Sequence, residues 1–241
     1  RGSTLTHVDW WRLLRSRPEV ARGYEALAHG LQLAGAHQPV KRVLVTSAQP
    51  EEGKTTVTIN LALTLAMAGK RTLLIDADLR KPGLHRALEL ENTRGFADIA
   101  TGEMGPDDLD AVQVVEMTDG DPSICPGLSV ITSGNASPGA LATMGSARAK
   151  EALDRLATDY DLVLLDSPPV LAVSDALLLA PMVDGVLLVL KSGVVTEEEA
   201  RRAKERLEEA GGHVLGLVLN HFNEGPHGPG VHPYGRYYQA E

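Results

Sequence analysis

Short apolar runs alternate with stretches of helical periodicity along most of this sequence. The runs lie near residues 43–47, 72–76, 128–132, 162–166, 185–190 and 214–219. Apolar residues recur at helical spacing near residues 55–68, 83–89, 147–158, 174–180 and 196–210. Two runs, Leu162–Leu165 and Val186–Leu190, are apolar at every position, which is typical of strands buried on both faces of a parallel sheet. The pattern predicts an α/β fold: a doubly wound, mostly parallel sheet flanked by helices.

The two ends of the chain depart from this alternation. Residues 8–34 show helical spacing, so an N-terminal helical arm is predicted over 1–40. The alternating core then covers 41–222. Beyond it, apolar periodicity stops and Gly, Pro and His become frequent, which predicts a flexible tail over 223–241. Residues 102–127, rich in Gly, Pro and Asp, are predicted to form a long, mobile surface segment.

Composition narrows the possible partners. A length of 241 residues with 43% apolar content is enough for one α/β domain. The net charge of −9 and the absence of a basic stripe argue against a nucleic-acid partner. The lone Cys125 fits a reducing compartment and excludes an internal disulfide. No apolar run approaches about 18 residues, so we expect no direct membrane insertion.

A phosphate-binding motif lies between the first apolar run and the first core helix. It reads Ala48-Gln49-Pro50-Glu51-Glu52-Gly53-Lys54-Thr55-Thr56 and fits the P-loop spacing. A strand that feeds a tight loop into a helix N-terminus turns backbone N–H groups toward one point, where phosphate oxygens can sit. Gly53 permits close approach, Lys54 supplies charge for the β/γ-phosphates, and the Thr55 hydroxyl is placed to bind Mg²⁺. A simple turn with a solvated lysine is the less favoured alternative.

Acidic residues follow two further strands. Residues 72–76 run into Asp76-Ala77-Asp78-Leu79-Arg80, and residues 162–166 run into Asp166-Ser167-Pro168-Pro169. In a parallel sheet both sets emerge at the same edge as the P-loop and can surround one Mg²⁺. The alternatives are a cap or turn role for Asp166, and a structural ion pair of Asp76 and Asp78 with Arg80.

The three motifs together resemble those of the bacterial tyrosine kinases of capsule and exopolysaccharide synthesis, which share the fold of MinD/ParA-type P-loop ATPases with deviant Walker motifs. The likeness covers most of residues 20–241. It implies binding of ATP/ADP and Mg²⁺. The implied catalytic residues are Lys54, Asp76, Asp78, Arg80 and Asp166, and the implied Mg²⁺ ligands are Thr55, Asp78 and Asp166. It also implies that the Asn220 amide reads the adenine, with a strand-ending turn role as the alternative.

The C-terminal tail holds three of the five tyrosines within its last eight residues. The resemblance implies that they are phosphoacceptors offered to a neighbouring subunit: Tyr234, Tyr237 and Tyr238. A chance cluster is the alternative. A phenol with a pKa of about 10 needs a carboxylate as its proton leaves. We assign that role to Asp76, with Asp78 and Asp166 holding Mg²⁺ through its waters, although the sequence leaves a swap of these roles open.

Partners are also implied by the resemblance. It implies a transmembrane activator or chain-length-determinant protein, and hence a cytoplasmic location at the inner face of the plasma membrane. The start, Arg1-Gly2-Ser3 without Met, suggests an excised piece, although a stand-alone subunit is the open alternative. The resemblance also implies a homo-oligomer. Its assembly into a ring stays open, because Arg22, Glu25 and Ala28 replace the family's Glu-x-x-Arg-x-x-Arg packing motif.

Two other functions compete with the kinase. One is a MinD/ParA-like regulatory ATPase, but Gln49 stands where those proteins usually carry a second lysine. The other is a nucleotide-binding, non-catalytic scaffold of polysaccharide export.

Overall fold

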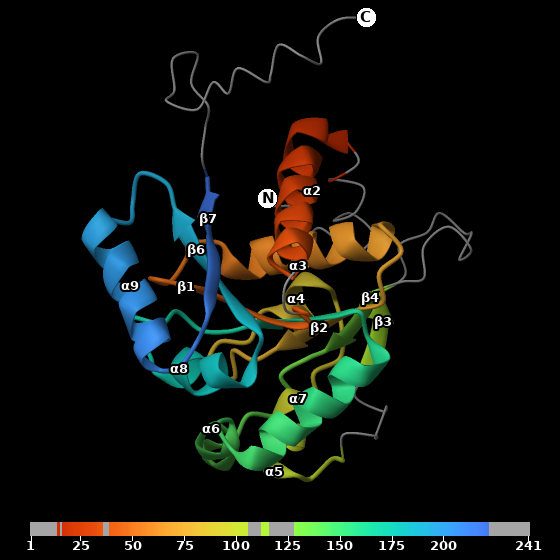
Figure 1. Ribbon diagram of the computed structural model, residues 1–241. Helices are drawn as coiled ribbons and strands as arrows, with labels where there is room; N and C mark the ends of the chain where they lie inside the picture. The colour runs from red at the N-terminus through yellow and green to blue at the C-terminus, as the bar shows by residue number, and fades with distance from the viewer. Residues whose placement is uncertain (1–13, 15, 36–38, 106–111, 116–127, 222–241) are drawn as a thin grey trace, which may run out of the picture.

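A seven-stranded sheet forms the centre of the molecule, as a computed structural model shows (Figure 1). The structure describes residues 14, 16–35, 39–105, 112–115 and 128–221. The strands are β1 (Arg42–Ser47), β2 (Thr72–Asp76), β3 (Val112–Val115), β4 (Leu128–Ile131), β5 (Leu162–Asp166), β6 (Gly185–Lys191) and β7 (Val214–Asn220). Their order is β3-β4-β2-β5-β1-β6-β7, and every neighbouring pair is parallel except β3 and β4. The predicted doubly wound, mostly parallel sheet is confirmed.

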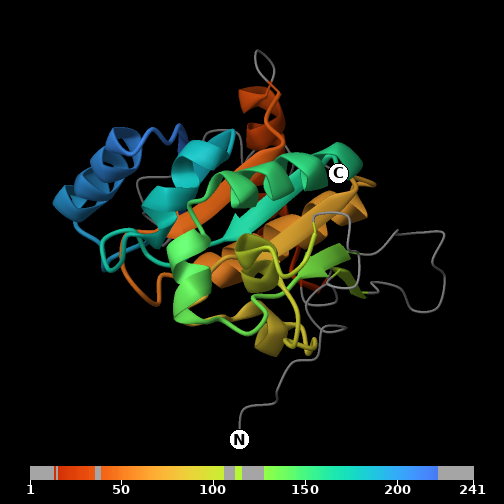
Figure 2. The ribbon, with the colours of Figure 1, turned by 90° about the horizontal axis from the view of Figure 1, so that it is seen from below.

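Helices cover both faces of this sheet. They are α2 (Pro18–Ala34), α3 (Lys54–Met67), α4 (Leu84–Ala87), α5 (Phe96–Thr101), α6 (Pro138–Thr143), α7 (Ala147–Asp159), α8 (Asp175–Leu179), the 3₁₀ turn η2 (Ala180–Met182) and α9 (Glu197–Glu209). Seen from below, α5, α6 and α7 lie nearest the viewer, while α2 and α3 cover the opposite face (Figure 2).

The central strands are apolar over most of their length because their side chains enter two cores. In β5, Val163 and Leu165 enter the core beneath α5–α9, whereas Leu162 and Leu164 enter the core beneath α2 and α3. Burial on both faces removes the alternation that a half-exposed strand shows. The same register sets Asp76 of β2 directly beside Asp166 of β5. The carboxyl ends of β1, β2 and β5 thus meet at one edge.

Helix α2 falls within the N-terminal residues that were predicted to be helical, and it lies against α3. Ala28 and Leu31 are buried there, and Asn60 Nδ2 of α3 lies 3.2 Å from the Tyr24 hydroxyl, to which it donates a hydrogen bond. Burial raises the pKa of Tyr24 above its ordinary value. A boundary between arm and core near residue 40 stays a prediction, as does the tail, which lies outside the described residues.

The structure corrects one segment of the sequence prediction. Residues 102–127 were expected to form a continuous mobile surface segment, but residues 112–115 form β3, which pairs antiparallel with β4 at the edge of the sheet. Four residues give too little periodicity to reveal a strand, since the pairing with β4 is what stabilises it. The helices α5 and α6 were also missed, because six residues each are too few to show a helical period.

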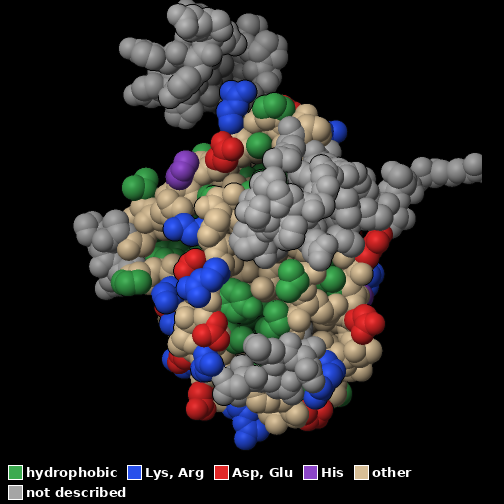
Figure 3. Space-filling view, turned by 90° about the vertical axis from the view of Figure 1, so that its right-hand side faces the viewer, with side chains coloured by type: hydrophobic (Ala, Val, Ile, Leu, Met, Phe, Trp, Pro, Cys, Tyr) green, Lys and Arg blue, Asp and Glu red, His purple; other side chains and the backbone are tan. Residues whose placement is uncertain are grey.

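Two surface findings bear on partners. Within the described part of the chain, no helix is long and apolar enough to cross a membrane. On the face shown in Figure 3, acidic and basic side chains are interspersed among the described residues, without one broad basic patch.

Candidate active site at the carboxyl edge of the sheet

The P-loop connects the end of β1 at Ser47 to the start of α3 at Lys54. Gly53 caps α3 with a left-handed φ of 85°, which favours glycine. A Cβ at Gly53 would lie 2.2 Å from Asn220 Nδ2, so a side chain there would collide with the Asn220 amide. That amide donates a hydrogen bond to the Glu52 carbonyl at 2.8 Å. The end of β7 is therefore tied to the phosphate loop.

The other residues of the predicted phosphate loop lie in different surroundings. Pro50, Glu51 and Thr56 are exposed, Gln49 is half-buried, and Ala48 and Glu52 are buried. Gln49 Nε2 donates to Glu199 Oε1 at 3.2 Å. Burial raises the pKa of Glu52 by more than the hydrogen bonds from the Gln49 and Ala48 amides lower it. The Glu52 carboxylate is buried and acidic, so this side chain is not suited to bind a phosphate.

Lys54 lies among the predicted carboxylates. Its Nζ is 3.1 Å from Asp78 Oδ2, 3.6 Å from Asp166 Oδ1 and 3.3 Å from Thr55 Oγ1. Burial opposes its charge, but the carboxylates of Asp166 and Asp78 hold the pKa of Lys54 above its ordinary value. The structure thus brings the P-loop lysine and both acidic motifs together.

Asp166 is completely buried and incompletely satisfied. Its Oδ2 accepts a hydrogen bond from the Thr55 hydroxyl at 2.6 Å, while its Oδ1 accepts none from the described residues. Burial raises the pKa of Asp166 despite the nearby Lys54. The carboxylates of Asp166 and Asp78 and the Thr55 hydroxyl together offer hard oxygen donors, which Mg²⁺ prefers.

This donor set is not a complete metal cage. Among the described residues, no group of three or more His, Cys, Asp and Glu side chains is arranged to hold a metal ion alone. Mg²⁺ usually keeps several waters and shares its remaining positions with substrate phosphates. The residues present therefore fit a magnesium ion that arrives with a nucleotide.

Asp76 organises the loop that follows β2. Its Oδ1 accepts from the Asp78 amide at 3.2 Å, and its Oδ2 accepts from the amides of Gly83 and Leu84 at 3.0 Å each. Burial and the charge of Asp166 raise the pKa of Asp76 to about 7. A carboxylate with such a pKa can accept or release a proton near neutral pH.

Arg80 has a different partner from those considered in the sequence. It binds Asp175, the first residue of α8, through Nε at 2.5 Å and Nη2 at 3.1 Å. The alternative of a structural ion pair with Asp76 or Asp78 is therefore wrong. Asp175 was not identified as a site residue, because a single acid at a helix start is common and its partner lies 95 residues away.

The remaining predicted residues lie elsewhere. Asn220 sits at the end of β7 beside the P-loop. The candidate phosphoacceptors Tyr234, Tyr237 and Tyr238 lie outside the described residues.

This fold and this edge define the class of the protein. A mostly parallel sheet with a P-loop after β1, and acids after β5 and β2, the next two strands along the sheet, is the architecture of a P-loop ATPase. Consistent with that class, residues 43–197 match the family described as AAA domain.

Sequence relatives then give the family. The chain is 38% identical over 197 residues to tyrosine-protein kinase YwqD of Bacillus subtilis (strain 168), which covers 82% of this chain and 79% of YwqD. It is also 33% identical over 195 residues to tyrosine-protein kinase etk of Escherichia coli (strain K12), covering 81% of this chain and 26% of etk. The chain belongs to the bacterial tyrosine-protein kinases.

Solved structures agree with this assignment. The chimerical protein CapA2B2 superimposes with a TM-score of 0.77 at 29% identity, covering 93% of this chain and 92% of the chimera. The kinase domain of the E. coli tyrosine kinase ETK gives a TM-score of 0.73 at 29% identity, covering 85% and 78% of the two chains.

Proposed function

We propose that this chain is an ATP- and Mg²⁺-dependent tyrosine autokinase that phosphorylates the tail of a neighbouring copy. The acceptors are Tyr234, Tyr237 and Tyr238. The observation that carries the proposal is the convergence of Lys54 with Asp78 and Asp166, because one lysine and several carboxylates at a P-loop match the needs of phosphoryl transfer.

The proposed roles follow from the chemistry of each group. Backbone amides of the P-loop and Lys54 bind the β- and γ-phosphates. Thr55, Asp78 and Asp166 hold Mg²⁺, directly or through its waters. When bound, Mg²⁺ neutralises charge on the phosphate oxygens.

Proton transfer is assigned to Asp76. The phenol oxygen bonds to the γ-phosphorus as the bond to the bridging oxygen of ADP breaks, and the phenolic proton leaves with a carboxylate. A pKa of about 7 suits Asp76 to this role, whereas Asp78 is paired with Lys54. Asp76 Oδ1 accepts only one hydrogen bond from the described residues and has a second lone pair for that proton.

Adenine recognition is assigned to Asn220. In the structure its amide donates to the Glu52 carbonyl and its carbonyl accepts from the His221 amide. Adenine would exchange for one of these bonds. The proximity of Asn220 to Gly53 supports this proposal.

The proposed setting is the inner face of the plasma membrane, where the kinase regulates exopolysaccharide or capsule polymerisation and export. A transmembrane activator, as a separate protein or an upstream segment, would hold it there. In support, the part of E. coli etk that this chain matches is only 26% of that protein. Assembly of copies would deliver the tail in trans.

The test is phosphate mapping by mass spectrometry after incubation with ATP and Mg²⁺. We expect phosphotyrosine on the tail, its loss in Lys54→Met, and loss of most of it when residues 232–241 are deleted. Lys41→Met is the matched control, because Lys41 lies at the opposite edge of the sheet and contacts the Ala157 carbonyl. A signal that survives both changes would contradict the proposal, and so would ATP hydrolysis without phosphotyrosine.

A further inference from the structure

A side-on ion pair joins the two acidic loops of the site. The Arg80 guanidinium presents Nε and Nη2 to the two oxygens of Asp175. The side chain of Asp175 is 4% exposed, whereas that of Arg80 is 45% exposed. Asp175 is therefore a buried anchor, and the guanidinium that it holds lies at the surface.

The anchor fixes the guanidinium relative to the catalytic loop. Arg80 lies two residues after Asp78, whose Oδ1 accepts from the Lys81 amide at 3.0 Å and whose Oδ2 lies 3.1 Å from Lys54 Nζ. Asp175 begins α8, after the loop that follows Asp166. The pair thus joins the loop after β2 to the loop after β5, beyond the edge where the phosphates are proposed to bind.

The Arg80 guanidinium keeps N–H donors that the pair with Asp175 does not use. A guanidinium is a planar fork with five N–H donors, and the side-on pair leaves the Nη1 group facing away from Asp175. Nη1 has no hydrogen-bond partner among the described residues. An arginine held by a buried carboxylate, with one end free, is preorganised to bind an anionic oxygen.

We propose that Asp175 is a positioning residue that holds Arg80 so that Nη1 binds a non-bridging oxygen of the phosphoryl group during its transfer. The inference rests on the proposed function, since it assigns Arg80 a target in that reaction. Charge on these oxygens is what a phosphoryl-transfer site must stabilise, and a fixed guanidinium does so without reorganisation.

The experiment compares Arg80→Gln, Asp175→Asn and the double variant. Each is measured for kcat and KM for ATP, affinity for a fluorescent ADP analogue, and Tm. We expect kcat to fall on the order of a hundredfold in Arg80→Gln and at least roughly tenfold in Asp175→Asn, with ADP affinity within about threefold. The double variant should be no slower than Arg80→Gln, because Asp175 acts through Arg80.

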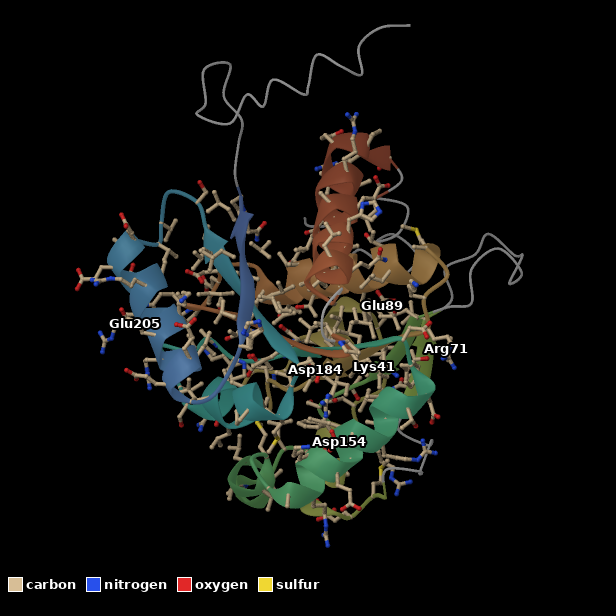
Figure 4. The ribbon with its side chains drawn as sticks, viewed as in Figure 1. Lys41, Arg71, Glu89, Asp154, Asp184 and Glu205 are labelled. Atoms are coloured by element: carbon tan, nitrogen blue, oxygen red, sulfur yellow. The ribbon has the colours of Figure 1, made fainter. Side chains whose placement is uncertain are left out.

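Two further variants separate positioning from structural support. Arg80→Lys keeps the charge but loses the fork, so we expect it not to restore kcat. Asp184→Asn breaks a similar arginine pair, with Arg42 at the opposite edge of the sheet, and should lower Tm without the selective loss of kcat (Figure 4).

The outcomes are decisive. Additive losses in the double variant, full activity in Arg80→Lys, or a fall in ADP affinity equal to the fall in kcat would overturn the inference. If Asp175→Asn does not fold, the two Arg80 variants decide, because the Arg80 side chain is nearly half exposed and its replacement leaves no buried cavity. ATP hydrolysis is recorded beside phosphotyrosine. A wild-type protein that hydrolyses ATP without phosphotyrosine rejects the proposed function but still tests the role of Arg80 in phosphoryl transfer.

Discussion

The two edges of the sheet use the same kinds of charged residues in opposite ways. At the carboxyl edge, the buried Asp76, Asp78 and Asp166 surround one lysine, Lys54. At the amino edge, Arg42 binds both Asp184 and Asp154, and Figure 4 shows both acids beneath the sheet, toward α7. Lys150 also pairs with Asp154, so two cations meet two acids at the amino edge, whereas the buried carboxylates of the carboxyl edge outnumber their one lysine.

The pKa values report this difference. Burial opposes ionisation of Asp184, but hydrogen bonds from the Arg42 guanidinium and from the amides of Arg42 and Lys41 hold its pKa below the ordinary value. The pKa of Asp166 is raised, since one lysine does not offset its burial. A fold normally compensates buried charge, and a cluster that one lysine compensates only in part agrees with the proposed binding of a magnesium nucleotide.

The largest effect is expected in how the free energy of unfolding depends on pH, because the carboxyl edge holds more buried carboxylates than cations. The pKa of Asp76 is raised from 3.8 to about 7, so the folded state binds more protons than the unfolded state between these values. Without Mg²⁺ or nucleotide, the stability of the wild type should therefore fall relative to Asp76→Asn as pH rises from about 4 to 7. The free energies of unfolding should diverge by up to about 4 kcal/mol. Denaturant titrations at several pH values measure these free energies. If those of the wild type and Asp76→Asn changed in parallel with pH, Asp76 would ionise with an ordinary pKa.

A second prediction opposes the two edges directly. At neutral pH and without ligand, Asp166→Asn should stabilise the protein by about 1–2 kcal/mol, because it removes a poorly compensated buried charge. Asp184→Asn should destabilise it by about 2 kcal/mol, because it weakens the pair with Arg42. Urea unfolding measures both. If both substitutions changed the free energy of unfolding in the same direction, the two edges would not differ in how their charge is compensated.

A third prediction concerns the effect of added Mg²⁺ on ADP binding. Mg²⁺ should increase the affinity for ADP of the wild type and of Asp184→Asn. In Asp166→Asn this increase should be on the order of tenfold smaller, a difference of about 1.4 kcal/mol in binding free energy. Calorimetric titration with and without Mg²⁺ measures the effect. Undiminished Mg²⁺ dependence in Asp166→Asn would place the metal elsewhere.

The smallest effect is expected at a pair on the surface of the amino edge. Arg71 and Asp161 lie 3.1 Å apart, with side chains 62% and 41% exposed. Solvent screens such a pair, so Arg71→Gln should change stability by less than about 1 kcal/mol. Thermal unfolding measures this change. A larger loss of stability would show that solvent screens the ion pair of Arg71 and Asp161 less than its exposure suggests.

How much of the site the sequence could predict depends on distance along the chain. Lys54 and Thr55 are found from one continuous motif, and Asp76 and Asp166 each end an apolar run. The pair of Arg80 with Asp175 could not be found this way, because two separate loops must first be brought together by the sheet. Strand β3 was missed because its pairing with β4 stabilises a segment with little periodicity of its own.

The sequence by itself determined six of the seven strands, the helix-starting P-loop and the acids after two strands, because apolar periodicity and loop chemistry are local. Only the tertiary structure decided that β5 lies between β1 and β2, that one oxygen of Asp166 remains without a hydrogen-bond partner among the described residues, and that Asp175 holds Arg80. These features depend on strand order and burial. Both arise from contacts between residues far apart in the chain, and burial is what changes the energy of a charge.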